Sequence, residues 1–194
     1  VWATHRPRVY FDDPAVLPFL WDRGYCVEVV HGSTLRDVMI QAGPFSLIVI
    51  SVKDDGSQSM NHHWQEQLAD FGIRSLTREH LRNSYISVIW KKNESQYSGL
   101  YEMVSEKPLS LMLLPGDQVQ EFRMPIRLDV RSAGSGSGNI SSIRINGVEH
   151  SRDLRGMNIV VYDLIAEKVS GVHRVDTFVT IYEDTTLYRG LPEA

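Results

Sequence analysis

The sequence predicts an α+β fold in which two layers of mostly antiparallel β-strands are flanked by helices. An apolar, β-branched run from Leu47 to Val52 stops at Asp54-Asp55-Gly56, which is typical of a buried strand that ends in a turn. An amphipathic helical pattern follows this turn. Farther along, Ile126 to Ser132 alternates between apolar and polar residues, as a strand with one buried face does.

The segment before the buried strand mixes extended and helical patterns. Prolines among aromatic residues in Val1 to Trp21 favour an extended, packed lead-in. Tyr25 to Val30 alternates like a strand and holds the single cysteine, Cys26, which we expect to be buried. Ser33 is placed to cap a short helix that Gly43-Pro44 ends. Together with the buried strand, these elements predict a β-α-β arrangement.

Residues 57 to 72 have the pattern of a helix that packs on the buried strand. Ser57 or Ser59 can cap its start, and Gly72 is placed to end it. Its apolar face, at spacings of three and four residues, consists of Met60, Trp64, Leu68 and Phe71.

A second strand, Tyr85 to Trp90, is predicted to return beside the first because its residues are aromatic and β-branched. Asp54 would then end one strand and Arg82 would precede the next. The two side chains could therefore become neighbours.

The second half of the chain is predicted to consist mainly of strands. Residues 91 to 107 are polar and predict a linker or an edge loop, with a domain boundary near 96 to 106. Leu109 to Leu114 is an apolar strand, and Pro115-Gly116-Asp117 is the turn after it. Asn146-Gly147 predicts a type I′ hairpin, since both residues tolerate positive φ.

An Arg-Gly pair precedes an alternating strand twice in the chain. Arg23-Gly24 stands before the strand at 25–30, and Arg155-Gly156 stands before an apolar run that ends at Asp163. After the second copy, we expect a turn around Ser170-Gly171 and a strand from Val172 to Phe178.

The order of these elements resembles a known domain family. The matching stretches are Val52-Lys53-Asp54-Asp55-Gly56-Ser57, Leu68-Ala69-Asp70-Phe71-Gly72, Arg82-Asn83-Ser84-Tyr85 and Asp22-Arg23-Gly24-Tyr25. They resemble the interleukin-like EMT inducer (ILEI, PANDER-like) family, which includes the stem domain of protein O-mannose N-acetylglucosaminyltransferase. The resemblance covers roughly residues 22 to 92 and also implies that the glycine-rich run at 132–138 crosses between packed strands.

The resemblance implies a sugar-binding site. In the stem domain, the positions that correspond to Asp54 and Arg82 contact the saccharide, as does the arginine of the Arg-Gly pair. In this sequence that third residue is Arg155 or Arg23. An arginine can donate hydrogen bonds to sugar hydroxyls, and a carboxylate can accept hydrogen bonds from them. A flat apolar or aromatic side chain would pack against the sugar ring, and Tyr85 is a candidate for it.

Two architectures fit the sequence. Residues 1–95 would supply the back half of the family's domain with a lead-in, and residues 107–194 would supply the front half. The halves form either one circularly permuted domain or two tandem domains of which the second is truncated. We favour the permuted domain, because neither half carries all of the family's strands.

Composition excludes several classes of function. The net charge of −4, with basic residues scattered along the chain, argues against nucleic acid as the main partner. No apolar run is long enough to insert into a membrane. A single cysteine allows no internal disulfide, whereas the cytokine-like members of the family carry disulfides.

The residues also give little support for catalysis. Asp54 and Asp55 could act as acid and base, but adjacent turn residues rarely point into one cleft. His62 and Glu66 share a helix face without a second histidine at ligand spacing. We therefore expect no catalytic residues, no metal and no cofactor. The alternative role for Asp54 and Arg82 is a structural salt bridge at the strand ends.

These observations predict a non-catalytic, lectin-like carbohydrate-binding module that accompanies a glycan-processing protein. Its partners would be a saccharide or glycan and other domains of the same polypeptide, in the secretory pathway or outside the cell. The alternative is a secreted, cytokine-like ligand of a protein receptor. We expect the tryptophans to serve the core. An exposed hairpin edge at 143–148 would offer a route to a dimer.

Overall fold

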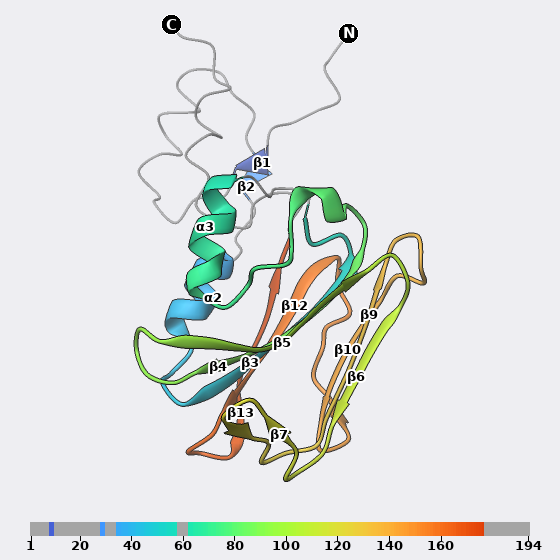
Figure 1. The fold of residues 1–194 in the computed structure, drawn as a ribbon. Coiled ribbons are helices and arrows are strands. Elements are labelled where there is room, and N and C mark those ends of the chain that lie inside the picture. Colours follow the sequence, from blue (N-terminus) through green and yellow to red (C-terminus); the bar gives the residue numbers. More distant parts are fainter. Residues whose placement is uncertain (1–7, 10–27, 30–33, 58–61, 177–194) are drawn as a thin grey trace, which may run out of the picture.

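The computed structural model describes residues 8–9, 28–29, 34–57 and 62–176, and most of the strands in this part of the chain belong to one large β-sheet (Figure 1). This nine-stranded sheet contains β3 (Ser46–Asp54), β4 (Ser84–Lys91), β5 (Tyr97–Ser105), β6 (Leu109–Leu113), β9 (Leu128–Gly134), β10 (Ile140–Ile145), β11 (Val148–Glu149), β12 (Gly156–Asp163) and β13 (Lys168–Val175). The helical elements are α2 (Leu35–Gln41), α3 (His62–Asp70) and the 3₁₀-helix η1 (Arg78–His80). Two small sheets pair β1 (Arg8–Val9) with β2 (Glu28–Val29) and β7 (Gln118–Val119) with β8 (Phe122–Arg123).

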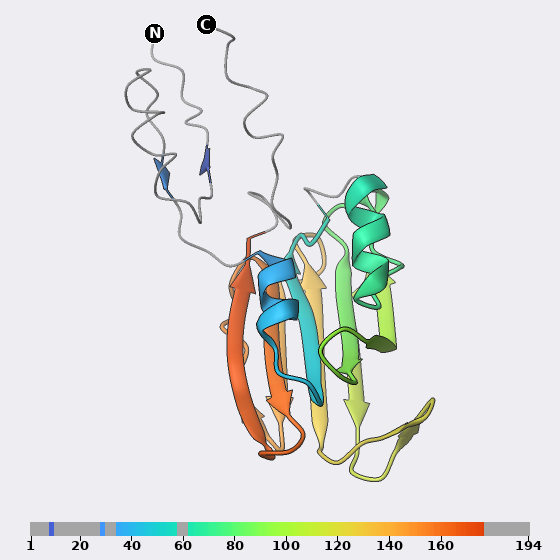
Figure 2. The same ribbon diagram turned by 90° about the vertical axis from the view of Figure 1, so that its left-hand side faces the viewer.

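The large sheet folds over into two packed halves. One half has the order β5-β4-β3-β12-β13, and the other has the order β6-β9-β10-β11. They join where Asp54 at the end of β3 pairs with Gly134 of β9, in the sheet's parallel contact. Helices α2 and α3 cover the outer face of the first half (Figure 2). The predicted α+β fold with mostly antiparallel strands is therefore confirmed, although the sheet is mixed.

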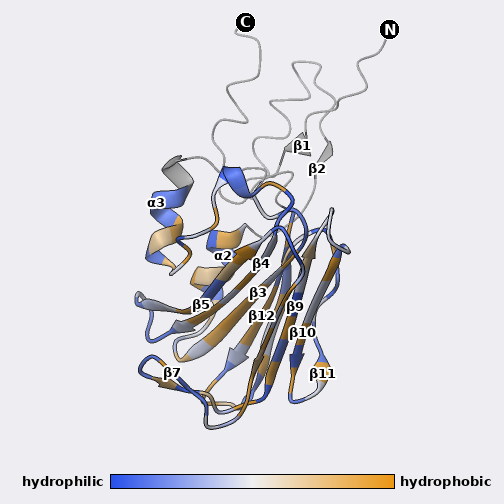
Figure 3. Cartoon of the chain, turned by 45° about the vertical axis from the view of Figure 1, so that its right-hand side comes forward, coloured by the Kyte–Doolittle hydropathy of each residue, from blue (hydrophilic) through white to orange (hydrophobic). Residues whose placement is uncertain are grey.

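Strand β3 lies at the centre because both of its faces are buried. Ile48 and Ile50 face the helices and join the core cluster that contains residues of α2 and α3. Leu47 and Val49 face the second half of the sheet and join the other core cluster. Strands of both halves carry apolar residues (Figure 3), and the second core cluster combines residues from both. The continuous apolar run in the sequence reflects burial on two sides.

Hydroxyl groups line the junction between the two halves. Ser51 Oγ donates a hydrogen bond to the carbonyl oxygen of Arg131 at 2.6 Å, and Ser132 Oγ donates to that of Val52 at 2.6 Å. The backbone N–H of Tyr85 donates to Ser132 Oγ at 2.9 Å. These bonds satisfy backbone groups where β4 separates from β3 and β9 takes its place.

Helix α3 ends at the predicted glycine. Gly72 adopts φ +84°, and its N–H donates to the carbonyl oxygen of Ala69 while that of Ile73 donates to Leu68. This is a Schellman motif, in which a left-handed residue lets the last carbonyls find donors. Leu68 and Phe71 are buried as predicted, whereas Met60 and Ser59 lie outside the described residues.

Helix α2 begins one residue later than the sequence predicts. Its N-cap is Thr34, whose hydroxyl accepts from the N–H of Asp37 at 3.2 Å, while the Asp37 carboxylate accepts from the N–H of Thr34 at 3.0 Å. This reciprocal capping box explains why the helix starts after Thr34. Ser33, the predicted cap, lies outside the described residues.

The predicted β-α-β unit is not formed by the described part of the chain. Within 25–30, Glu28–Val29 forms β2, which pairs in parallel with β1 and not with the large sheet. Cys26 and most of the lead-in lie outside the described residues.

The prediction of a linker or edge loop at residues 91 to 107 is wrong for residues 97–105, which form β5. This strand pairs antiparallel with β4 from Lys91↔Tyr97 to Ser84↔Ser105. It is an edge strand of the described sheet, and most of its residues are only partly buried. Segments from both halves of the chain therefore supply strands to one sheet.

Two hairpins test the predicted turns. Asn146 and Gly147 have φ of 49° and 83° between paired Ile145 and Val148, which confirms the predicted hairpin. The prediction of a turn at Ser170-Gly171 is wrong, since both residues lie inside β13. The chain reverses earlier, where the Asp163 carboxylate accepts two backbone N–H groups of the loop.

Glu149 makes the β10–β11 hairpin sensitive to acid. Burial opposes ionisation, but hydrogen bonds from Ser142, Ile143, Ser151 and the Arg144 guanidinium hold the pKa of Glu149 below its usual 4.5. At a pH between the folded pKa of Glu149 and 4.5, the unfolded chain binds more protons at this residue than the folded chain does. The stabilisation from the ionised carboxylate is therefore complete above pH 4.5, and it is lost as the pH falls through the folded pKa.

We expect Glu149→Gln to lower the urea midpoint at about pH 7 and to have a smaller effect near pH 3. Glu106→Gln is the control, because Glu106 is exposed and makes no ion pair with any described residue. An equal effect of Glu149→Gln at both pH values would contradict the assignment.

Candidate functional site

Three strand ends meet at one edge of the sheet. Asp54 ends β3, Arg82 lies two residues before β4, and Arg155 directly precedes β12. Both β4 and β12 run antiparallel to β3, so their starts lie beside its end. In register, Gly156 pairs with Lys53, which places Arg155 next to Asp54 along the backbone. The fold thus brings the backbones of three predicted sugar-binding residues together.

Asp55 anchors this edge. Its side chain is fully buried, and its Oδ1 accepts hydrogen bonds from the N–H of Ser57 at 3.0 Å, the hydroxyl of Ser57 at 2.9 Å and the N–H of Arg82 at 2.9 Å. The first bond closes an Asx-turn after β3. The third ties the segment before β4 to that turn, so the position of Arg82 is fixed through its backbone.

The backbone at this edge is strained. Asp54, Arg82 and Asp153 adopt positive φ angles of 68°, 60° and 51°. The left-handed region is uncommon for residues other than glycine, and it persists only where surrounding contacts impose it. For Arg82 one such contact is Gly134, since a Cβ built on that glycine would lie 1.8 Å from the carbonyl oxygen of Arg82.

The side chains of Asp54 and Arg82 are available to a ligand. Asp54 is partly buried and Arg82 is exposed. Within 34–57 and 62–176, neither the Asp54 carboxylate nor the Arg82 guanidinium forms a hydrogen bond or an ion pair. The salt bridge between them that the sequence left as an alternative is therefore not formed. Asp55 performs the structural role instead.

Arg155 is held by a neighbouring carboxylate. Its guanidinium donates to Asp176 Oδ2 at 2.8 Å, and Arg174 donates to the same oxygen at 2.9 Å. The Arg155 side chain remains 40% exposed, whereas that of Asp176 is 6% exposed. Arg155 is thus oriented and partly accessible at once. Arg23, the other candidate for the third position, lies outside the described residues.

Tyr85 does not form the wall of this site. Its ring is buried on the helix side of the sheet, and its hydroxyl donates to Glu102 at 2.8 Å. Burial, and then the charge of Glu102, raise the pKa of Tyr85 well above its ordinary value. The exposed apolar residues at the edge are Leu81 and Leu154, which are 49% and 43% exposed.

Sequence reasoning missed these two leucines. Each directly precedes a predicted site arginine, Arg82 or Arg155, and this adjacency is the signal that could have found them. They flank the edge and offer apolar surface beside its charged groups.

A lysine fixes the loop before β12. Lys53 Nζ donates to the carbonyl oxygen of Asp153 at 2.9 Å and lies 3.1 Å from its carboxylate. That carboxylate also accepts from the N–H of Ser141 at 2.8 Å. The loop that carries Leu154 and Arg155 is therefore tied to β3 and β10.

The core role expected for tryptophan is confirmed at Trp90. Its ring packs on the second core cluster and lies 5.0 Å from the ring of Phe122. The other indole side chains lie outside the described part of the chain.

The described residues contain no group of three or more His, Cys, Asp or Glu that could hold a metal ion. None of the helices in this part of the chain has the length and apolar composition needed to cross a membrane. Comparisons with protein-family models, curated proteins and solved structures find no match. The site is thus defined by its own geometry, which presents a carboxylate, two guanidinium groups and apolar side chains on a rigid edge.

Proposed function

We propose that this chain is a non-catalytic carbohydrate-binding module that accompanies a glycan-processing protein, in the secretory pathway or outside the cell. Asp54, Arg82 and Arg155 would contact the saccharide. The observation that carries the proposal is the pair Asp54 and Arg82, whose side chains make no bond to a described residue although their backbones are held in strained conformations. Strain of this kind clusters at ligand-binding sites.

The chemistry of the edge suits a neutral polar ligand. An ionised carboxylate accepts hydrogen bonds, and a guanidinium donates several in a fixed fork. Vicinal hydroxyls of a sugar can donate to the first and accept from the second. Leu81 and Leu154 would cover the apolar face of the ring, since both are exposed beside the arginines.

The resemblance to the interleukin-like EMT inducer family supports the same proposal. Its three saccharide contacts correspond to Asp54, Arg82 and an arginine before glycine. Register places Arg155 beside the end of β3, which favours it over Arg23 as the third contact. In the permuted architecture, residues 107–194 supply the front half of the domain and residues 1–95 supply the back half. Strands from both of these segments lie in one sheet, which agrees with that architecture.

Saccharide titration of the wild type, Asp54→Ala and Arg82→Ala tests this function by ligand-observed NMR. We expect millimolar to micromolar binding by the wild type and about 10- to 100-fold weaker binding by each variant, since a hydrogen bond to a charged group contributes about 1.5 to 3 kcal/mol. Thermal melts should change little for Arg82→Ala, because its side chain bonds to no described residue, and Asp54→Ala should lose about 1 kcal/mol or less, because alanine adopts the left-handed φ of 68° less readily than aspartate.

Asp70→Ala and Arg131→Ala are matched controls. Both residues are exposed, and neither forms an ion pair with a described residue. They should bind like the wild type. If a panel of neutral and charged saccharides gives no binding to the wild type, the proposal fails. If Asp54→Ala and Arg82→Ala bind normally, the site lies elsewhere.

A further inference from the structure

Strand β6 lies at an edge of the large sheet in the described part of the chain. It pairs with β9 on one side, from Leu109↔Ser132 to Leu113↔Leu128. No strand among the described residues pairs with its other side. In Figure 1 it forms the outer margin of the second half of the sheet. Its backbone groups on that side can accept another strand.

The other long edges carry features that block such pairing. At β5, the Gln120 side chain donates to the carbonyl oxygens of Gly99 at 2.9 Å and Leu100 at 3.3 Å. The backbone of Gly72 also packs against Gly99. Strand β13 carries lysine, histidine and arginine. Charges and covering side chains are the usual protection of sheet edges.

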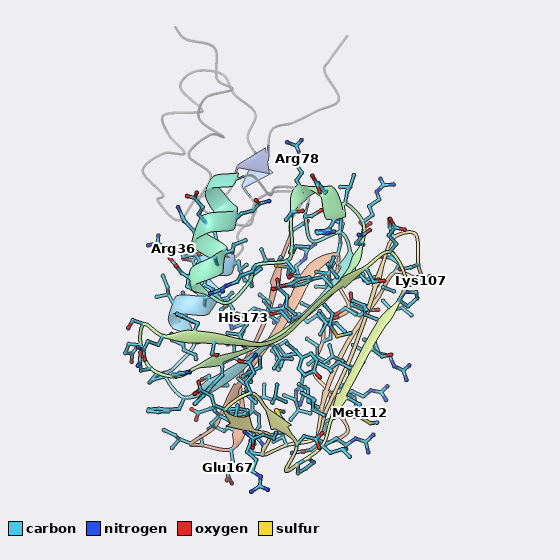
Figure 4. The ribbon with its side chains drawn as sticks, in the orientation of Figure 1. Arg36, Arg78, Lys107, Met112, Glu167 and His173 are labelled. Carbon is cyan, nitrogen blue, oxygen red and sulfur yellow. The ribbon has the colours of Figure 1, made fainter. Side chains whose placement is uncertain are left out.

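Strand β6 carries no charged side chain of its own, although the Arg127 guanidinium donates to Met112 Sδ at 3.9 Å. Between Pro108 and Pro115 the sequence is Leu-Ser-Leu-Met-Leu-Leu, without a charge. Met112 is 59% exposed and projects from the outer face (Figure 4). Proline has no backbone N–H to donate, so Pro108 and Pro115 limit the stretch of this edge with which another strand can pair.

The inner face of the strand is symmetric about Leu111. Leu109, Leu111 and Leu113 face the core between the two halves of the sheet. Ser110 and Met112 are exposed on the outer face. If the same strand is laid antiparallel beside it, with Leu111 opposite Leu111, leucines meet leucines on the inner face and Ser110 meets Met112 on the outer face.

We propose that β6 pairs with β6 of a second copy of this chain, antiparallel about a two-fold axis at Leu111. The two sheets become continuous in a closed, isologous dimer. Within one copy Met112 pairs with Asp129 and Ser110 pairs with Arg131. Each outer row of the dimer therefore runs from Asp129 of one copy, where Arg127 pairs with it at 2.8 Å, to Arg131 of the other.

A charge exchange at Ser110 and Met112 tests the register. In the double variant Ser110→Lys, Met112→Lys, each introduced lysine lies opposite one of the second copy. In Ser110→Glu, Met112→Lys, glutamate lies opposite lysine in both symmetric pairs, and within each copy the glutamate lies beside Arg131 and the lysine beside Asp129. We expect the first variant to dimerise about 10- to 30-fold more weakly than the second, since each cross-strand pair changes the affinity modestly.

Sedimentation velocity over a concentration series measures this difference, and thermal melts check that both variants fold. Both positions are exposed, so the monomer should tolerate them. Ile165→Lys is the control, because Ile165 is 73% exposed in the loop between β12 and β13. A wild type that stays monomeric up to about 500 µM would overturn the proposal and leave the edge to another partner. Equal dimerisation of the two double variants would overturn the register.

Discussion

Replacing Gly134 by alanine is expected to lower the free energy of unfolding by about 3 to 5 kcal/mol. A Cβ at this position would lie 1.8 Å from the carbonyl oxygen of Arg82 and 2.9 Å from the carbonyl carbon of Asn83. Both are backbone atoms, so relief requires a shift of β9 away from β4. That shift would also break the bond from the N–H of Gly134 to Ser84 Oγ at 3.1 Å. Urea denaturation measures the loss.

Gly136→Ala is the matched control for this prediction. A Cβ on Gly136 has no atom within 4 Å, although the residue lies in the same glycine-rich run. Its free energy of unfolding should stay within about 0.5 kcal/mol of that of the wild type. Similar losses in both variants would mean that the run as a whole, and not the contact with Arg82, determines stability.

Gly134 also couples the fold to the candidate site. The residue that it contacts is Arg82, whose left-handed backbone is tied to Asp55 at 2.9 Å. A stabilising background that lets Gly134→Ala fold should therefore still displace Arg82. The strained edge exists because two segments far apart in the chain pack without a side chain between them.

The large features of the fold could be predicted from local patterns. The buried strand, the glycine that ends α3 and the Asn146-Gly147 hairpin each follow from a few adjacent residues. Local patterns failed where tertiary contacts decide the structure. The polar residues of β5 predicted a linker, because a partly buried edge strand and a loop can share a composition. The cap of α2 was missed by one residue, because the carboxylate that completes the capping box lies at Asp37.

The candidate site could be predicted only in part. Asp54 and Arg82 were expected to be neighbours, because one ends a strand and the other precedes its antiparallel partner. The sequence did not reveal that Asp55, which resembled a simple turn residue, would bury its carboxylate and hold Arg82 by its N–H. Nor could it show that Tyr85 turns toward the helices, since the face of a strand residue depends on register.

Lys91→Met is expected to destabilise the chain by about 3 to 5 kcal/mol. Lys91 is fully buried, and its Nζ donates to the carbonyl oxygens of Met39 at 3.0 Å, Ile40 at 3.1 Å and Ala42 at 2.5 Å. These belong to the end of α2, which has no basic residue in its own last turn. Burial lowers the pKa of Lys91, but the carbonyl dipoles offset part of the cost of desolvating the ammonium group.

Methionine preserves most of the volume of the lysine and removes its donors, so the loss would report the orphaned carbonyls and not a cavity. Hydrogen exchange should quicken first in α2, which packs on β3 through Leu35, Val38 and Met39. Lys92→Met is the control, because the Lys92 side chain is 32% exposed and pairs with the exposed Glu121. It should cost about 1 kcal/mol or less. If both variants unfold at the wild-type urea midpoint, the end of α2 is satisfied without Lys91, and the docking of this helix rests on its apolar face alone.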